Sequence, residues 1–431
     1  MLTEEKVSLG QKLYQFIERL YPICRSITGE GVRETLALIK KEIPLTIQEV
    51  PSHTPVLDWT VPKEWNIRDA YIKNAKGEKV VDFKKSNLHV VSYSVPIRKK
   101  VNLEELKTHV FTLPDHPDWV PYRTAYYKED WGFCMSHKEF TALKEGEYEG
   151  FIDSDLKDGS LTYGEYFIKG KTSDEILVSC HVCHPSLCDD NLSGIAVAAF
   201  LAKNLSKNQD LHYSYRFLFI PGTIGSITWL ARNEARTKLI KHGLVLTCVG
   251  DENRPTYKRS RRGDTEIDRA FVHVLRQSGA DYHVIDFFPY GYDERQYCSP
   301  GFNLPVGCFM RGQHGKFPEY HTSADNLQFV KPGFLADSFF KCESVIQLLE
   351  NNKTYVNQSP KGEPRLGNRG FYKTVGGVDR EANEMALLWV LNLSDGNHAL
   401  LDIAERSGLK FDVIKAAADA LLAVKLLEEK K

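Results

Sequence analysis

The sequence lacks an excess of either charge, because 56 lysines and arginines stand against 57 acidic residues among 431. Balanced charge creates no global field that would attract nucleic acid or an anionic membrane. No apolar run approaches the length of a membrane span, and residues 1–10 hold acids and lysines where a signal peptide needs an apolar core. We therefore expect a cytoplasmic protein without a membrane or nucleic-acid partner. The basic run Lys258–Arg262 is expected to be a solvated loop rather than a clamp for a carboxylate or phosphate.

The sequence also lacks internal repeats, low-complexity tracts and a disulfide framework. Its nine cysteines are an odd number, and three crowd at Cys180, Cys183 and Cys188, a pattern that favours reduced thiols. A thiolate zinc site would need a second pair of cysteines, so we rank it below a site made of other ligands. With 431 residues, 42% of them hydrophobic, the chain predicts a globular protein of two or three domains.

Changes of pattern along the chain predict its domains. Apolar residues at helical spacing over Val7–Leu20 and Val32–Lys41 predict two opening helices. The next stretch is rich in proline and tryptophan and contains short β-like runs such as Leu88–Tyr93, which predicts an inserted β-rich domain. Three short helical patterns with tight turns close the chain and predict a winged helix. The predicted domains are an α/β domain over 1–50 and 131–380, the β-rich insertion over 51–130, and a winged helix-turn-helix domain over 381–431.

Strand and helix patterns alternate within the predicted α/β domain, which is typical of a sheet with parallel neighbours and helical crossovers. Binding sites in such sheets gather beyond the carboxyl ends of the strands. We predict a mixed sheet flanked by helices, with its chemistry near residues 181–191, 221–225 and 250–254. The predicted strands are 176–180, 215–220 and 244–249, and the predicted helices are 195–205 and 226–235.

Histidines and a carboxylate follow the first of these strands. His181, His184 and Asp190 come between the strand and its helix, and His321 lies in a later polar loop. Neutral imidazole and ionised carboxylate are the ligands of a hydrolytic zinc site, and Asp325 is placed to orient His321. Taken singly, a histidine at a strand end is more often structural than a ligand, and Asp190 could be a helix N-cap. Because both segments fall at the predicted site edge, we favour a metal centre.

Two motifs connect the chain with a known family. Asp190–Gly194 (DNLSG) and Tyr320–Asp325 (YHTSAD) are similar to signatures of the zinc aminopeptidases of peptidase M28 type. Over nearly its full length the chain resembles a bacterial group of aminopeptidase-like proteins that have an inserted β-rich domain and a C-terminal winged helix. That group is associated with surface-polysaccharide biosynthesis. The segments that carry the second resemblance are Arg25–Gly31, Trp131–Cys134, His181–Pro185 and Asp293–Tyr297.

The resemblance to the M28 type implies roles for the metal residues. The first histidine would bind one metal ion, the aspartate would bridge two, and the late histidine would bind the second, with His184 as competitor or helper to His181. Three positions depart from the family pattern. Gly222 stands where a glutamate is expected, Thr247 where an aspartate ligand is expected, and Cys183 where an aspartate supports the first histidine. We therefore expect one zinc ion rather than two.

The missing glutamate is the general base of the M28 type, so a replacement is needed. Glu294 is our first choice and Asp293 the second, because their segment resembles the loop that closes over the substrate. The alternative is that these residues form a local salt-bridge cluster. The family-like motifs also predict that Arg25, Arg295 and Tyr297 bind the substrate.

These observations favour a zinc-dependent hydrolase of aminopeptidase type that acts on a small peptide or amide. Two alternatives stay open: a zinc amidohydrolase acting on an acylated amino sugar, and a binding scaffold that has lost its activity. The predicted last helix carries Asp412 and Asp419 against Lys415, whereas phosphate contacts need clustered basic side chains. We therefore expect the winged helix to bind a protein partner or a second copy of the chain.

Overall fold

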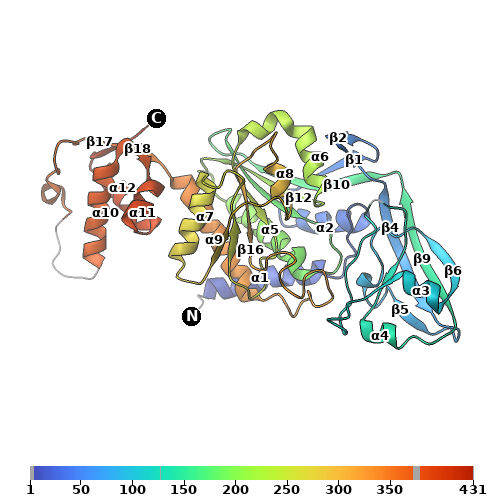
Figure 1. Cartoon of the computed structure of the whole chain (residues 1–431). Coiled ribbons are helices and arrows are strands. Elements are labelled where there is room, and N and C mark those ends of the chain that lie inside the picture. The colour runs from blue at the N-terminus through green and yellow to red at the C-terminus, as the bar shows by residue number, and fades with distance from the viewer. Residues whose placement is uncertain (1–3, 127, 372–378, 431) are drawn as a thin grey trace. The chain divides into compact units, whose positions relative to one another are not determined.

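The computed structural model describes residues 4–126, 128–371 and 379–430 (Figure 1). Two compact units make up the chain: residues 1–265 with 281–340, and residues 266–280 with 341–431. Within the described ranges, no helix combines the length and the apolar character that crossing a membrane requires.

An eight-stranded mixed sheet forms the centre of the first unit. In spatial order its strands are β1 (Thr46–Pro51), β10 (Ser160–Ile168), β12 (Ser214–Ile220), β11 (Glu175–His181), β13 (Ile240–Leu246), β16 (Val306–Met310), β14 (Thr256–Lys258) and β15 (His283–Ile285). The four strands from β12 to β16 run parallel, and antiparallel pairings extend the sheet on both sides. Every residue of β11 and β12 is buried, as expected for a parallel sheet covered by helices. The predicted α/β class is confirmed.

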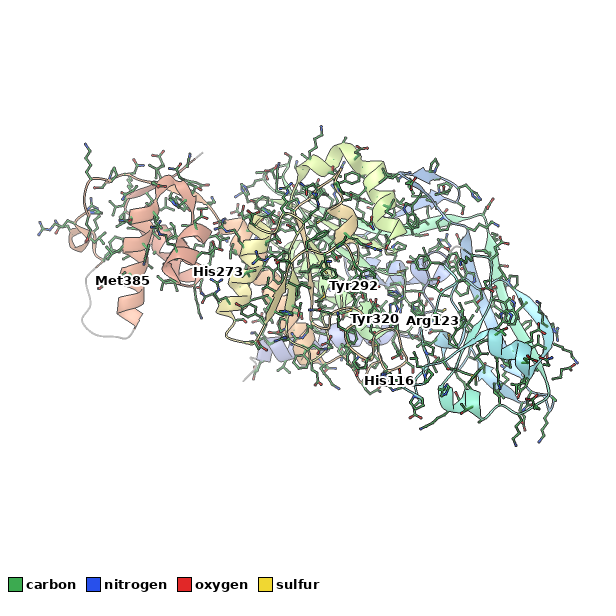
Figure 2. All side chains as sticks on the ribbon, viewed as in Figure 1. His116, Arg123, His273, Tyr292, Tyr320 and Met385 are labelled. Carbon is green, nitrogen blue, oxygen red and sulfur yellow. The ribbon has the colours of Figure 1, made fainter. Side chains whose placement is uncertain are left out.

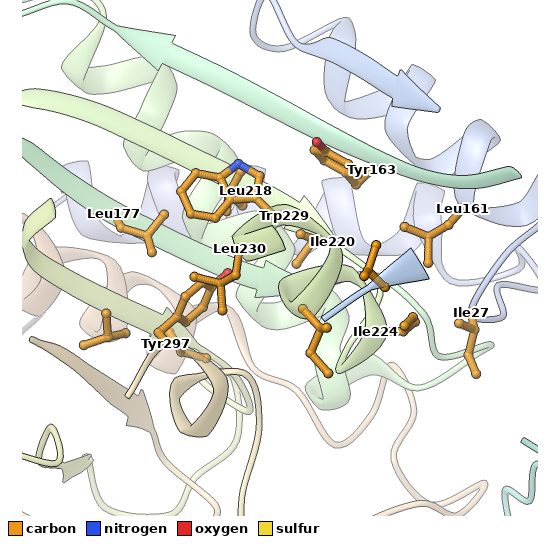
Figure 3. Packing of buried hydrophobic residues seen from close by; sticks show 14 of the residues in the cluster. Ile27, Leu161, Tyr163, Leu177, Leu218, Ile220, Ile224, Trp229, Leu230 and Tyr297 are labelled. Atoms are coloured by element: carbon orange, nitrogen blue, oxygen red, sulfur yellow. The ribbon is translucent and has the colours of Figure 1, made fainter. Parts of the chain in front are cut away.

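Helices cover this sheet, and their apolar side chains complete its core. They are α1 (Glu4–Leu20), α2 (Glu30–Lys40), α5 (Gly194–Leu205), α6 (Ile224–Asn233) and α8 (Glu294–Tyr297), with α9 (Pro332–Asn351) beginning in this unit and ending in the second. α5 contacts the three central strands and α1, whereas α6 contacts α8. Leu177 and Leu218 of the sheet share a buried cluster with Trp229 of α6 and Tyr297 of α8 (Figure 3). This packing fixes the strand ends beside which the candidate site lies.

A separate four-stranded antiparallel sheet follows β1 in the chain. Its strands, in spatial order, are β5 (Lys79–Asp82), β4 (Glu64–Lys73), β9 (Glu147–Lys157) and β6 (Ile97–Asn102), and the short pieces between β6 and β9 in the chain are α3 (Leu103–Thr108), β7 (Val110–Phe111), β8 (Phe133–Cys134) and α4 (His137–Thr141). β2 (Pro55–Val56) and β3 (Trp59–Thr60) form a separate antiparallel pair, and β2 contacts α6. The strand predicted over Leu88–Tyr93 is wrong. Ser86 Oγ instead accepts from the Leu88 N–H and caps a 3₁₀ turn, after which Val90 and Ser92 form isolated bridges only.

The second unit contains a small three-stranded sheet and a helical core, which confirms the predicted winged helix. Its elements are α7 (Glu266–Gln277), β17 (Thr354–Asn357), α10 (Asp379–Leu393), β18 (Asp395–Ala399), α11 (Leu400–Ser407), α12 (Phe411–Ala423) and β19 (Leu427–Glu429). Apolar residues of α10, α11 and α12 pack in one buried cluster. The Arg269 guanidinium on α7 donates to Asp402 and Glu405 of α11, which ties these two helices of the unit together.

Candidate metal centre

His181 and Asp190 meet at the carboxyl end of β11. His181 is the last residue of that strand, and Asp190 lies in the irregular turn Cys188–Ser193 that leads into α5. His181 Nε2 lies 2.7 Å from Asp190 Oδ1, and both side chains are buried. The strand end and the helix start thus bring an imidazole and a carboxylate together.

His184 completes a group of three donor atoms. Its Nδ1 lies 3.1 Å from His181 Nε2 and 3.5 Å from Asp190 Oδ1. Ligand atoms at about 2.0–2.2 Å from a tetrahedral zinc ion lie about 3.4 Å from one another. The separations of 3.1 and 3.5 Å are close to that edge length, whereas the pair at 2.7 Å lies at hydrogen-bond distance. Imidazole nitrogen and carboxylate oxygen are donor types that zinc binds.

Electrostatics at this cluster favour the protonation states that bind metal. Burial lowers the pKa of His184 to about 3, so its imidazole is neutral at pH 7. Burial alone would raise the pKa of Asp190, but the neighbouring His184 and His181, together with the hydrogen bonds to His181 and His321, hold that pKa well below its usual range. Neutral imidazole and ionised carboxylate are the forms that coordinate zinc.

His321 approaches the other oxygen of the same carboxylate. Its Nε2 lies 2.9 Å from Asp190 Oδ2, although the two residues are 131 positions apart in the chain. His321 has a positive φ of 56°, which is uncommon for a residue other than glycine, and its ring stacks on that of Tyr320 at 4.0 Å. All four residues predicted as metal ligands therefore lie in one cluster around Asp190.

Residues of the predicted insertion hold the His321 loop in place. The Tyr122 N–H donates to the His321 carbonyl at 2.8 Å, and Pro121 pairs with Thr322 in an isolated β-bridge. The Tyr122 ring meets the rings of His184 and His321 edge-on, at 5.2 and 5.0 Å. Sequence reasoning missed this contribution, because the pairing joins segments about 200 residues apart.

Asp325 does not orient His321, contrary to our prediction. Its two carboxylate oxygens accept the backbone N–H groups of Asp189 and Asp190, at 2.6 and 3.0 Å. The loop after His321 folds so that Asp325 reaches under the turn before α5. Burial raises the pKa of Asp325 to about 8, although these backbone donors oppose the shift. Asp325 therefore supports the turn that presents Asp190.

The strands that flank β11 end without carboxylates. Gly222 follows β12, and Thr247 follows β13 and is fully buried. A Cβ atom added at Gly222 would lie 3.2 Å from the Cβ of His181 and 3.7 Å from both carboxylate oxygens of Asp293. The Asp293 carboxylate thus lies close to the space into which a side chain at position 222 would project.

Asp293 and Glu294 are adjacent but lie in different environments. Asp293 accepts a hydrogen bond from Ser226 Oγ at 2.9 Å, and burial raises its pKa to about 6 while the nearby His181 opposes that shift. Glu294 forms a fully buried ion pair with Lys258 at 2.8 Å. Lys258 is therefore not in a solvated loop as predicted, because it neutralises Glu294 in the interior. The geometry favours Asp293 over Glu294, our first choice, as the carboxylate beside the candidate metal ligands.

The three residues predicted to bind substrate lie in different places. Arg25 is buried and donates to the carbonyls of His184 and Pro185 at 2.8 and 3.0 Å, so it holds the histidine loop instead of contacting a substrate. Tyr297 is fully buried, and its hydroxyl lies 2.9 Å from Ser179 Oγ, which assigns it to the core. Only Arg295 stays partly exposed.

Tyr292 and Tyr320 belong to the site and were missed from the sequence. The Tyr292 ring stacks on that of His181 at 4.6 Å, and its hydroxyl donates to that of Tyr320 at 3.2 Å. Figure 2 labels both tyrosines. Tyr292 directly precedes Asp293 in the chain, and Tyr320 directly precedes His321. That proximity was the available signal, but it could not show which way the rings point.

Comparison with known proteins identifies the family. A family model described as a domain of unknown function (DUF4910) matches residues 14–352, and a winged helix-turn-helix model matches residues 353–429. The chain belongs to the DUF4910 family. A Clostridium acetobutylicum protein named for polysaccharide biosynthesis, with an aminopeptidase-like domain, is 57% identical over 420 residues, which cover 97% of this chain and 96% of that protein.

Solved structures agree with this assignment. A crystal structure of a candidate peptidase from Clostridium acetobutylicum has a TM-score of 0.95 at 55% identity and covers 99% of this chain and 98% of its own. A zinc aminopeptidase from Bacillus subtilis has a TM-score of 0.59 at 13% identity, with 79% and 94% covered. A peptidase M28 precursor from Shewanella amazonensis gives 0.56 at 14%, with 81% and 97% covered. The two distant likenesses concern the fold, and they confirm that this DUF4910 member has an aminopeptidase-like fold.

Proposed function

We propose that this DUF4910 protein is a zinc-dependent hydrolase that cleaves an amide or peptide bond. The observation that carries the proposal is the convergence of His181, His184 and Asp190, whose donor atoms lie within 4.8 Å of one another. His321 adds a fourth donor on the far oxygen of Asp190. Catalytic zinc sites take three protein ligands of these types and keep a further position open for water or substrate.

Each residue of the centre has a role in the proposed reaction. Zinc, when bound, polarises an amide carbonyl and lowers the pKa of a coordinated water. His181, Asp190 and His321 would hold the ion, with His184 as helper or competitor. Asp293 would accept the proton of the attacking water and return it to the leaving nitrogen, in place of the glutamate missing at position 222. Because burial raises the pKa of Asp293 to about 6, its carboxylate is ionised at pH 7 yet basic enough for this role.

We propose one zinc ion rather than two. The donors that are present all face Asp190, whereas Gly222 and Thr247 supply no carboxylate at the neighbouring strand ends. A second ion would have to take His321 from the first ion and share the Asp190 carboxylate with it, with water in its other positions. Such a site would bind more weakly than the first.

A second candidate function is hydrolysis of an acylated amino sugar. It is supported by the name of the Clostridium acetobutylicum relative, which refers to polysaccharide biosynthesis. The chemistry at the metal would be the same, because both reactions cleave an amide.

Location and partners also belong to this proposal. The nine cysteines all lie among the described residues and none of them forms a disulfide, which supports a cytoplasmic protein. Lys415 on α12 pairs with Asp419 at 2.5 Å, so the helix presents little free positive charge to a phosphate backbone. We propose that the winged helix binds a protein partner or another copy of the chain.

The proposal is tested first by the metal. Elemental analysis of the purified protein is expected to find about one zinc per chain, reduced in His181→Ala and His321→Ala variants, and the His184→Ala variant shows whether His184 is a ligand or a helper. The zinc-loaded protein is then assayed with aminoacyl-nitroanilides and, for acetate release, with N-acetylated amino sugars. Turnover in either assay supports a hydrolase and identifies its type. Bound zinc with no turnover in both would contradict the hydrolase and favour a binding scaffold.

A further inference from the structure

A surface cavity of about 700 Å³ lies at the opposite end of β11 from the candidate metal centre. Glu175, the first residue of that strand, lines the cavity, whereas His181 at the metal cluster is the last. A strand of seven residues spans about 20 Å, so the two places are separate. The volume lies within the range of about 300–1,000 Å³ that is usual for small-molecule sites. The cavity is therefore a second candidate binding site in the first unit.

Two segments form the walls of the cavity. One is the loop 169–173 between β10 and β11, and the other comprises residues 232–239 at the end of α6 and beyond it. The loop is fixed, because its Gly170 N–H donates to Ser214 Oγ at 3.1 Å. A Cβ atom added at Gly170 would lie 2.0 Å from the Tyr213 carbonyl oxygen, so glycine is required for this close approach. The side chains of the loop are therefore presented from a defined backbone.

Positive charge exceeds negative charge along these walls. Four of the lining residues are basic and one is acidic: Lys169, Lys171, Arg232, Arg236 and Glu175. The carboxylate of Glu175 is already held by Arg216, whose Nε and Nη2 each donate to it at 2.7 Å. Arg236 Nη1 lies 4.0 Å from the same carboxylate, too far for a hydrogen bond. The cavity thus has an excess of positive charge, although the whole chain has a formal net charge of −1.

The other basic side chains are only partly neutralised. Lys171 pairs with Asp210. In the described part of the chain, Lys169 and Arg232 form no ion pair with a carboxylate, and Arg232 lies beside the uncharged hydroxyl of Tyr163. Like charges that gather in one cavity repel one another, and an anion bound between them would remove that repulsion.

An aromatic ring lies at the same cavity. Phe167 is one of the lining residues and is 42% exposed. The Arg216 guanidinium, which Glu165 and Glu175 hold in place, lies 4.8 Å from the centre of this ring. The ring is thus supported by the protein and still accessible, so it can pack against a ring of a ligand.

We propose that this cavity binds a small molecule that carries phosphate groups and a ring, as a nucleotide or a sugar phosphate does. Guanidinium binds phosphate through paired hydrogen bonds, and lysine binds it as a point charge. A phosphate monoester carries close to two negative charges at pH 7, so it matches several cations better than a carboxylate does. Phe167 would contact the ring. The ligand is distinct from the substrate of the proposed hydrolase, and the inference does not rest on that function.

Binding to the full-length protein is measured by isothermal titration calorimetry with two matched pairs of probes. ADP is compared with pyrophosphate, and glucose 1-phosphate is compared with inorganic phosphate. We expect pyrophosphate to bind, and one of the two probes with a ring to bind more tightly than its match. Preference for ADP identifies a nucleotide site, and preference for glucose 1-phosphate identifies a sugar-phosphate site. If neither ring improves binding, the proposed ligand class is overturned.

The charges are tested with two double variants. Lys169→Gln combined with Arg232→Gln is expected to weaken pyrophosphate binding by about tenfold or more, because charge-assisted hydrogen bonds are lost. Arg98→Gln combined with Lys100→Gln removes the same charge from exposed ion pairs on β6 and is expected to preserve binding. Equal losses in the two variants would overturn the proposal, since they would reflect net charge and not the cavity.

The ring contact and the independence from the metal are tested last. Phe167→Ala is expected to remove the advantage of the preferred probe over its match, and Phe167→Tyr, which keeps a ring, is expected to retain it. Asp190→Asn, which is expected to lack zinc, should bind pyrophosphate as wild type does. Loss of binding in Asp190→Asn, or no measurable binding of pyrophosphate to wild type, would overturn the proposal. Failure to hydrolyse any amide would contradict the proposed function without affecting these binding results.

Discussion

The end of β11 and the ends of its two neighbours differ in chemistry although they belong to one sheet. β11 ends at His181 and is followed by His184 and Asp190, while β12 and β13 are followed by Gly222 and Thr247. The backbone around all three strand ends has an aminopeptidase-like fold, as the similarity to the Bacillus subtilis zinc aminopeptidase shows. The comparison shows that strands of one sheet can be followed by different side chains, and we propose that these side chains set the number of metal ions held.

Removal of the Asp190 carboxylate is expected to have the largest effect, because the candidate ligands gather around it. Asp190 contacts three imidazoles, so Asp190→Asn loses the ionised oxygen on which the cluster depends. We expect zinc content to fall from about one ion per chain to near zero by elemental analysis. Asp395→Asn, at the exposed first residue of β18 in the winged helix, is the matched control. Full zinc content in Asp190→Asn would show that the cluster is not the metal site.

The second prediction concerns Asp293, the proposed general base in place of the glutamate missing at position 222. Asp293→Asn keeps the shape of the side chain but cannot accept a proton, so the turnover number should fall by about 10²- to 10⁴-fold. Zinc content should stay unchanged, because Asp293 is not expected to bind the ion. Glu294→Gln distinguishes the neighbouring carboxylate, whose partner is Lys258. A larger loss of turnover in Glu294→Gln, with the fold intact by circular dichroism, would return the role of base to Glu294.

The pH dependence of turnover sharpens the same assignment. A general base acts in its ionised form, and burial raises the pKa of Asp293 to about 6. Activity should therefore be high above pH 6 and fall about tenfold for each unit below it. Initial rates between pH 4.5 and 8 test this, with zinc content measured at each pH. A flat profile in wild type, with zinc retained throughout, would exclude Asp293 as the base.

Adding carboxylates after β12 and β13 is expected to have the smallest effect. It tests directly whether the difference between the strand ends matters. A Cβ atom at Gly222 would lie 3.2 Å from the His181 Cβ, so that neighbour must move by a few tenths of an ångström to admit a side chain. We expect Gly222→Glu combined with Thr247→Asp to bind a second zinc equivalent in a calorimetric titration, with Thr247→Asp alone as the control. A stoichiometry that stays at one would show that side chains at these two positions do not set the number of ions.

Much of this arrangement could be predicted because it depends on local pattern. The apolar runs ending at His181 and Ile220 predicted strands whose ends share an edge, and this placed His181 near Asp190. The choice between Asp293 and Glu294 could not be predicted in this way, because adjacent residues at a helix start point in different directions. Only the tertiary structure shows that Lys258 is buried and takes Glu294 as its partner. The prediction that Arg25 binds substrate failed for a similar reason, since a motif does not reveal whether an arginine faces a ligand or backbone carbonyls of the protein.

The bridge between Pro121 and Thr322 brings the predicted insertion to the candidate metal centre, where the Tyr122 ring meets the rings of two candidate ligands edge-on. A domain without contacts to the candidate site could be exchanged between homologues without affecting that site. Here a foreign insertion would also replace the residues that support His321. The segment that contains Tyr122 and the loop that contains His321 are therefore expected to have changed together. Chimeras within the family should succeed only when the segment before Trp131 and the histidine loop come from the same parent.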